Sequence, residues 1–185
     1  MKDERIIDLF LERSEQAITE LDGRYGAMCR RVAGNILGSA QDAEECVNDA
    51  YLALWNTIPP EKPQPLSAYL CRVVRNLSIK RYHANTAQKR NSFYDAALEE
   101  LEDCLPAAET AETILSAQEL TVLLNAFLAT LSREDRTLFL RRYWFSEPVG
   151  QLARACHISE GNASVRLSRI RSRLRQYLRK EGYPV

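Results

Sequence analysis

The sequence has only seven glycines in 185 residues, which leaves little of the turn chemistry that strands and hairpins need. No apolar run reaches transmembrane length, and the N-terminal stretch MKDERIIDLF is charged and amphipathic, unlike a signal peptide. There is no Gly-rich phosphate loop, no HExxH motif and no Ser-His-Asp arrangement. We therefore expect an all-α, cytoplasmic protein that is not an enzyme.

Metal-ligand spacing is also missing. The chain has two histidines, His83 and His157, and only His157 has a close cysteine, the adjacent Cys156. The five cysteines are scattered without a CxxC pair: Cys29, Cys46, Cys71, Cys104 and Cys156. A zinc site needs such ligands at short spacing, so we interpret the cysteines as buried free thiols in a reducing compartment. We expect no metal and no cofactor.

Charge is balanced overall but unevenly distributed. The chain has 25 basic and 25 acidic residues, and residues 131–185 carry 12 basic against 5 acidic ones. Residues 62–94 are basic and contain no acid, whereas residues 91–132 contain eight acids and neither Lys nor Arg. Two basic blocks separated by an acidic one predict two polyanion-binding surfaces joined by a connector that avoids the polyanion.

Apolar periodicity predicts two helical domains, at residues 1–90 and 113–185, with a flexible acidic linker at 91–112 that contains a transient helix near 94–102. Gly23 is expected to separate the first two helices, and the proline-rich segment 59–65 cannot be helical. The helices are expected at residues 3–21, 24–37, 40–58, 66–83, 113–130 and 133–144, before a C-terminal helical pair.

The C-terminal pair is the most specific pattern of the chain. Seven basic residues and no acid lie between Arg166 and Lys180. The apolar positions of the same segment are spaced as one helix face: Ala163, Leu167, Ile170, Leu174 and Leu178. A short helical pattern and a tight turn at 156–159 precede it, with Ser146 and Ser159 as expected N-caps. This order predicts a helix-turn-helix whose second helix fits the DNA major groove.

Three segments resemble the extracytoplasmic-function (ECF) group of the sigma-70 family of bacterial RNA polymerase sigma factors. They are the acidic run from Asp42 to Trp55, the segment Tyr69–Leu77 with its Arg-Asn-Leu ending, and Leu131–Leu178 with its Ile-Ser-Glu-Gly turn. The resemblance implies a region 2-like bundle and a region 4-like helix-turn-helix domain. His157 stands where the family usually has Gly, and a turn with positive φ tolerates His better than most residues.

The resemblance also implies the partners: core RNA polymerase, through the β′ clamp helices and the β flap, promoter DNA, and an anti-sigma factor. Polymerase contacts are expected at Asp42, Glu45, Asp49, Leu52 and Asn56. Contacts to the minus-ten element are expected at Arg72, Arg75, Asn76, Lys80 and Arg81. Contacts to the minus-thirty-five element are expected at Ser159, Asn162, Val165, Arg166, Arg169, Arg171 and Arg173. We expect Arg166 to be the main base reader, and the loop 59–65 to capture a base during DNA opening.

Three alternatives to this function stay open. A stand-alone helix-turn-helix regulator would bind a palindromic duplex as a dimer, without polymerase. A sigma-like adaptor would bind polymerase but no specific promoter. A small helical hydrolase is the third, and the sequence assembles no catalytic set for it.

Overall fold

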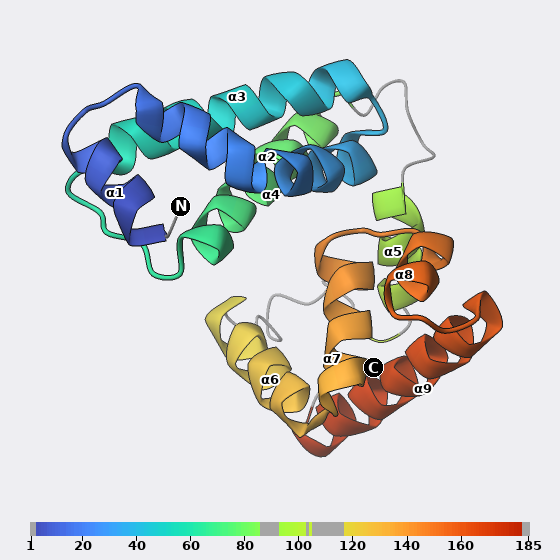
Figure 1. Ribbon diagram of the computed structural model, residues 1–185. Helices are drawn as coiled ribbons and strands as arrows, with labels where there is room; N and C mark the ends of the chain where they lie inside the picture. The colour runs from blue at the N-terminus through green and yellow to red at the C-terminus, as the bar shows by residue number, and fades with distance from the viewer. Residues whose placement is uncertain (1–2, 86–92, 103, 105–116, 183–185) are drawn as a thin grey trace. The chain divides into compact units, whose positions relative to one another are not determined.

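The computed structural model describes residues 3–85, 93–102, 104 and 117–182, and in these residues it consists of helices without strands (Figure 1). The predicted all-α fold is confirmed. The chain divides into two compact units, residues 1–93 (unit 1) and residues 94–185 (unit 2). None of the described helices combines the length and the apolarity needed to cross a membrane.

Unit 1 is a bundle of four helices. They are α1 (Asp3–Leu11), α2 (Gln16–Leu37), α3 (Ala40–Thr57) and α4 (Leu66–Ala84). The last three pack against one another and α1 packs against α2 (Figure 1). Ser39 caps α3, since its hydroxyl accepts a hydrogen bond from the Asp42 N–H at 3.3 Å. The core of unit 1 is formed by buried apolar side chains such as Leu21, Ile36, Leu54, Leu70 and Val74.

The first helix of unit 1 ends earlier than predicted. We expected one helix over residues 3–21 with a break at Gly23, but α1 ends at Leu11 and α2 continues through Gly23. The turn between them places Arg13 in the left-handed region with φ 55°, and the guanidinium of Arg13 lies 5.4 Å from the centre of the Trp55 ring. Arg13 also donates a hydrogen bond to the Trp55 carbonyl. A contact 42 residues away therefore fixes a break that local periodicity does not show.

Unit 2 is built around one long helix. Its elements are α5 (Phe93–Glu102), α6 (Ala117–Thr130), α7 (Arg133–Phe139), the π-helical turn η1 (Leu140–Trp144), α8 (Val149–Ala155) and α9 (Glu160–Lys180). The whole predicted apolar face of α9, from Ala163 to Leu178, is buried. It packs on side chains from the other helices, among them Phe127, Leu138 and Leu152.

The segment predicted as a flexible acidic linker contains α5 where a transient helix was predicted, and this helix is packed. Ala97 and Cys104 are buried in the core of unit 2, and Leu101 packs against that core. Ala97 and Leu101 are four positions apart and lie on one face of α5, whereas Cys104 follows the end of this helix at Glu102. Residues 91–92, 103 and 105–112 of the predicted linker lie outside the described residues, and the domain bounds 1–90 and 113–185 stay a prediction.

The helix-turn-helix is confirmed at its second helix and differs at its first. Ser159 caps α9 as predicted, accepting from the Asn162 N–H at 3.2 Å. Ser146 is not the cap of α8, because Pro148 precedes the first helical residue and Ser146 is buried with φ 52°. In the turn, His157 has φ 55°, the left-handed conformation expected for a glycine substitute at this position.

Candidate polymerase and DNA interfaces

The five residues expected to contact polymerase lie on one face of α3. Their spacing of three and four positions repeats along the helix, and all but the half-buried Asp42 are exposed: Asp42, Glu45, Asp49, Leu52 and Asn56. Leu52, a large apolar side chain, is 59% exposed. An apolar centre with acidic neighbours suits a partner that offers an apolar patch ringed by basic groups.

A basic and polar stripe runs along α4. Arg72, Asn76 and Lys80 are exposed and follow one another at intervals of four residues, while Arg75 is half-buried. The Arg72 guanidinium lies 5.2 Å from the centre of the Tyr69 ring, which orients it without neutralising its charge. The stripe can hold phosphates through its two cations and offers an amide to a base edge.

Arg81 connects the two candidate surfaces of unit 1. Although it was expected to bind DNA, its guanidinium bonds to Glu45 and lies 3.5 Å from the Asp42 carboxylate. The hydrogen bond from Arg81, with a second from Gln41, lowers the pKa of Glu45. The resemblance predicts Arg81 as a DNA contact, but the sequence does not show its pairing with Glu45, because the two residues are 36 positions apart.

An ionic cluster that the sequence did not indicate joins α2 to α3. Arg30 donates to the Asp22 carboxylate at 2.8 Å, and the Tyr51 hydroxyl donates to the same oxygen at 2.8 Å. The hydrogen bond from Arg30 is the main reason that the pKa of Asp22 is lowered. Gly26 lies between the two charged side chains, and a Cβ there would come within 2.2 Å of the Asp22 oxygen. The missing side chain therefore lets this pair form.

The outer face of α9 carries most of the residues expected at the minus-thirty-five element. Five of the seven are exposed: Ser159, Asn162, Val165, Arg169 and Arg173. Val165 is 50% exposed and can contact a thymine methyl group. Arg166 is partly buried because it pairs with Asp135 of α7 at 2.6 Å. With its neighbours it lines a hollow of about 430 Å³ between the two helices.

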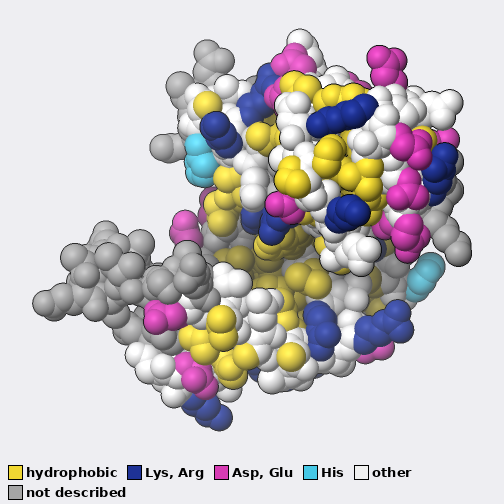
Figure 2. Space-filling view, turned by 90° about the vertical axis from the view of Figure 1, so that its left-hand side faces the viewer, with side chains coloured by type: hydrophobic (Ala, Val, Ile, Leu, Met, Phe, Trp, Pro, Cys, Tyr) yellow, Lys and Arg dark blue, Asp and Glu magenta, His cyan; other side chains and the backbone are white. Residues whose placement is uncertain are grey.

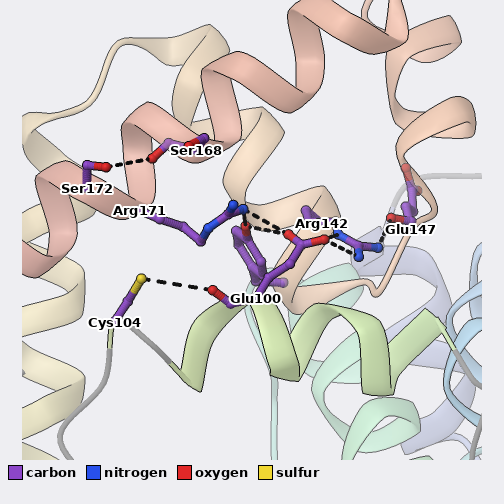
Figure 3. A network of polar contacts seen from close by, with 8 residues as sticks. Glu100, Cys104, Arg142, Glu147, Ser168, Arg171 and Ser172 are labelled. Carbon is purple, nitrogen blue, oxygen red and sulfur yellow. Dashed lines mark hydrogen bonds and ion pairs between the residues drawn. The ribbon is translucent and has the colours of Figure 1, made fainter.

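Arg171 differs from the other arginines of α9. We expected it to contact DNA phosphates, but its Nη1 donates to Glu100 at 3.0 Å and to the Tyr143 hydroxyl at 2.7 Å (Figure 3). Glu100 also accepts from Arg142, and Tyr143 donates to it at 2.9 Å. Burial is the main cause that raises the pKa of Tyr143. In the structure Arg171 thus holds α9 to α5.

Two of the buried thiols have raised pKa values. Burial raises the pKa of Cys29 to about 12 and that of Cys71 to about 11, so both thiols are protonated at neutral pH. Among the described residues, no group of three or more His, Cys, Asp and Glu is placed to hold a metal ion. Figure 2 shows a face on which basic and acidic side chains of unit 1 lie among apolar ones, so that face offers no uniform charge to a polyanion.

Two family descriptions match the chain, one in each unit. Residues 21–88 match sigma-70 region 2, and residues 121–174 match sigma-70 region 4. Together the matches cover more than half of the sequence. The chain belongs to the sigma-70 family. The α3 face and the α4 stripe lie within the region 2 match, and nearly all of the outer face of α9 lies within the region 4 match.

Relatives agree with the expected group within that family. The ECF RNA polymerase sigma factor SigL of Mycobacterium tuberculosis, matched in three strains, is 27% identical over 160 residues, which is 85% of this chain and 86% of SigL. The solved structure of CnrH in complex with the cytosolic domain of CnrY is 18% identical and covers 97% of this chain and 99% of that chain, with a TM-score of 0.45. The prediction of a promoter-directing ECF sigma factor is confirmed.

Proposed function

We propose that this sigma factor uses three separate surfaces: the α3 face for core RNA polymerase, the α4 stripe for the minus-ten element and the outer face of α9 for the minus-thirty-five element. It acts as a specificity subunit and not as an enzyme. It works in the cytoplasm and reaches the nucleoid when it is bound to polymerase.

The observation that carries the polymerase surface is the exposure of Leu52 at the centre of an otherwise polar face. Burying the exposed part of this side chain against a partner contributes about 1–2 kcal/mol to association. Asp49 and Asn56 lie one turn to either side and remain accessible. The β′ clamp helices are the proposed partner of this face, and the β flap is the proposed partner of unit 2. An anti-sigma factor stays a prediction.

The DNA surfaces divide the work. On α4, Arg72 and Lys80 hold phosphates and Asn76 offers its amide to a base edge, with the loop 59–65 placed just before this helix to receive an unstacked base. On α9, Arg169 and Arg173 hold phosphates and Arg166 reads a base edge. The promoter needs two spaced elements because unit 1 and unit 2 each present a separate DNA-binding surface.

One experiment separates the proposed role of α3 in polymerase binding from the proposed role of α9 in promoter recognition, using a variant on each surface and a matched control. Asp49→Lys is expected to weaken binding to core polymerase about tenfold, because it reverses a charge within the contact face. Asp8→Lys makes the same change on the exposed side of α1 and serves as the matched control. Arg166→Ala is expected to lower transcription from a cognate promoter and to leave core binding unchanged.

Binding to core polymerase is measured by competition with fluorescently labelled wild-type protein, and transcription by run-off from a promoter that the wild type uses. If Asp49→Lys and Asp8→Lys bound core polymerase equally well, the α3 face would not be the polymerase contact. Loss of core binding in Arg166→Ala would show that its role is misassigned. Specific binding of the isolated protein to a palindromic duplex would favour the stand-alone regulator.

A further inference from the structure

The ion pair between α7 and α9 fixes the orientation of one arginine on the recognition helix. Asp135 Oδ1 accepts from Arg166 Nε at 2.9 Å and from Arg166 Nη2 at 2.6 Å, although the residues are 31 positions apart. Their side chains are 22% and 28% exposed, so the pair is partly shielded from water. Two hydrogen bonds to one edge of a planar group restrict its rotation as well as its position.

The backbone that carries the Asp135 carboxylate is held in place by further hydrogen bonds. Asp135 is the third residue of α7, and its N–H donates to the hydroxyl of the capping residue Ser132 at 3.1 Å. The next residue, Arg136, donates to the Leu128 carbonyl at 2.8 Å and to the Ala129 carbonyl at 3.3 Å, at the end of α6. These contacts hold the first turn of α7 and with it the position of the Asp135 side chain.

The remaining donors of Arg166 match one base. An arginine has five N–H donors, and the pair uses one on Nε and one on Nη2, which leaves the edge formed by Nη1 and Nη2. That edge suits the N7 and O6 acceptors that guanine presents in the major groove. Arg166 is the seventh residue of α9, within the first two turns, where recognition helices contact bases.

The two other arginines on the outer face of α9, Arg169 and Arg173, lack this arrangement within the described residues. Arg169 and Arg173 are exposed on the same side and form no ion pair with any part of the chain that the structure describes. They can rotate to follow phosphates. Arg171 is bonded to Glu100 and Tyr143. On the outer face of α9 a carboxylate therefore orients Arg166 alone, toward the hollow that Asn162 and Arg169 also line.

We propose that Asp135 is a positioning residue that sets the base specificity of this sigma factor, by holding Arg166 in the orientation that selects guanine in the minus-thirty-five element. The proposal rests on the proposed DNA role of α9. It has a consequence that a purely structural role would not have. An aspartate close to DNA repels phosphates, so its removal lowers discrimination and at the same time raises affinity for unselected sequences.

The test uses holoenzyme formed from the full chain and core RNA polymerase. A promoter that the wild type selects from fragmented genomic DNA is altered at each upstream base pair in turn, and binding to every variant is measured at fixed salt. Asp135→Asn is expected to reduce the preference for guanine at one position about tenfold, while affinity for the altered sequences stays equal or rises. Glu134→Gln, the same change on the exposed neighbour, is expected to keep the wild-type preference.

Two further variants exclude a folding effect. Asp135→Glu retains a carboxylate and is expected to restore the guanine preference, and Asp135→Asn is expected to change nothing when Arg166→Ala is already present. An unchanged preference in Asp135→Asn, or equal weakening on all sequences, would overturn the inference and leave the proposed function intact. If the wild-type holoenzyme selected no sequence, both the proposed function and this inference would be contradicted.

Discussion

Arg142 of η1, whose side chain is only 4% exposed, is paired with Glu100 of α5 at 2.6 Å. The same carboxylate also binds Arg171 of α9, so a single acidic side chain joins three elements of unit 2 (Figure 3). A buried guanidinium that loses its carboxylate partner keeps much of the cost of its desolvation, although the Glu147 carbonyl still accepts from Arg142 Nη1 at 3.0 Å. The helix α5, which lies in the acidic segment, is therefore part of the structure of unit 2.

Glu100→Gln is expected to lower the free energy of unfolding of unit 2 by about 2 kcal/mol, since it removes charged hydrogen bonds to Arg142 and Arg171. Trp55 and Trp144 are the two tryptophans of the chain, one in each unit, so a Trp55→Phe background lets Trp144 fluorescence report urea unfolding of unit 2 alone. Glu99→Gln, on the exposed side of α5, is the matched control. Equal stability of the two variants would show that Glu100 contributes nothing.

The left-handed turn before α9 predicts opposite effects for two substitutions at one position. His157 is exposed and has φ 55°, so His157→Gly removes backbone strain without removing packing and is expected to raise the free energy of unfolding by about 1 kcal/mol. His157→Val places a β-branched residue there and is expected to lower it by a similar amount. Urea unfolding followed by Trp144 fluorescence measures both. A destabilising glycine would contradict the assigned turn.

Low pH should lower the free energy of unfolding of unit 1, because Asp22 becomes protonated. Its pKa in the folded state is lowered below its ordinary value of 3.8, mainly by the hydrogen bond from Arg30. A lowered pKa gives stability that is present above the unfolded value and is lost as the pH falls through the folded value. Asp22→Asn should therefore show a shallower loss of stability below about pH 4 than the wild type. Trp55 fluorescence in a Trp144→Phe background measures it, and identical slopes would exclude this role.

The sequence correctly predicted the features that depend on residues close together in the chain. The apolar face of α9, the N-cap at Ser159 and the left-handed turn at His157 each depend on residues that are close in sequence, and the structure agrees with all three. The α3 face has the predicted exposure as well, because its three- and four-residue spacing alone decides which side of a helix its residues share.

What the patterns missed depends on partners far apart in the chain. The turn at Arg13 depends on Trp55, and the positions of Arg171, Arg166 and Arg81 depend on carboxylates that lie 71, 31 and 36 residues away. A basic helix face shows how many cations are present but not which of them are already paired. The cap expected at Ser146 failed for a local reason, since Pro148 moves the start of α8.

Start-site mapping in a purified transcription reaction tests the central claim most directly. Core RNA polymerase is incubated with fragmented genomic DNA, with and without this protein, and the 5′ ends of the RNA products are mapped. The expected result is a set of new start sites that share two spaced upstream motifs and whose RNA products decrease with Asp49→Lys but not with Asp8→Lys. If no new start sites appear while the protein still binds DNA by itself, promoter direction by this sigma factor is contradicted.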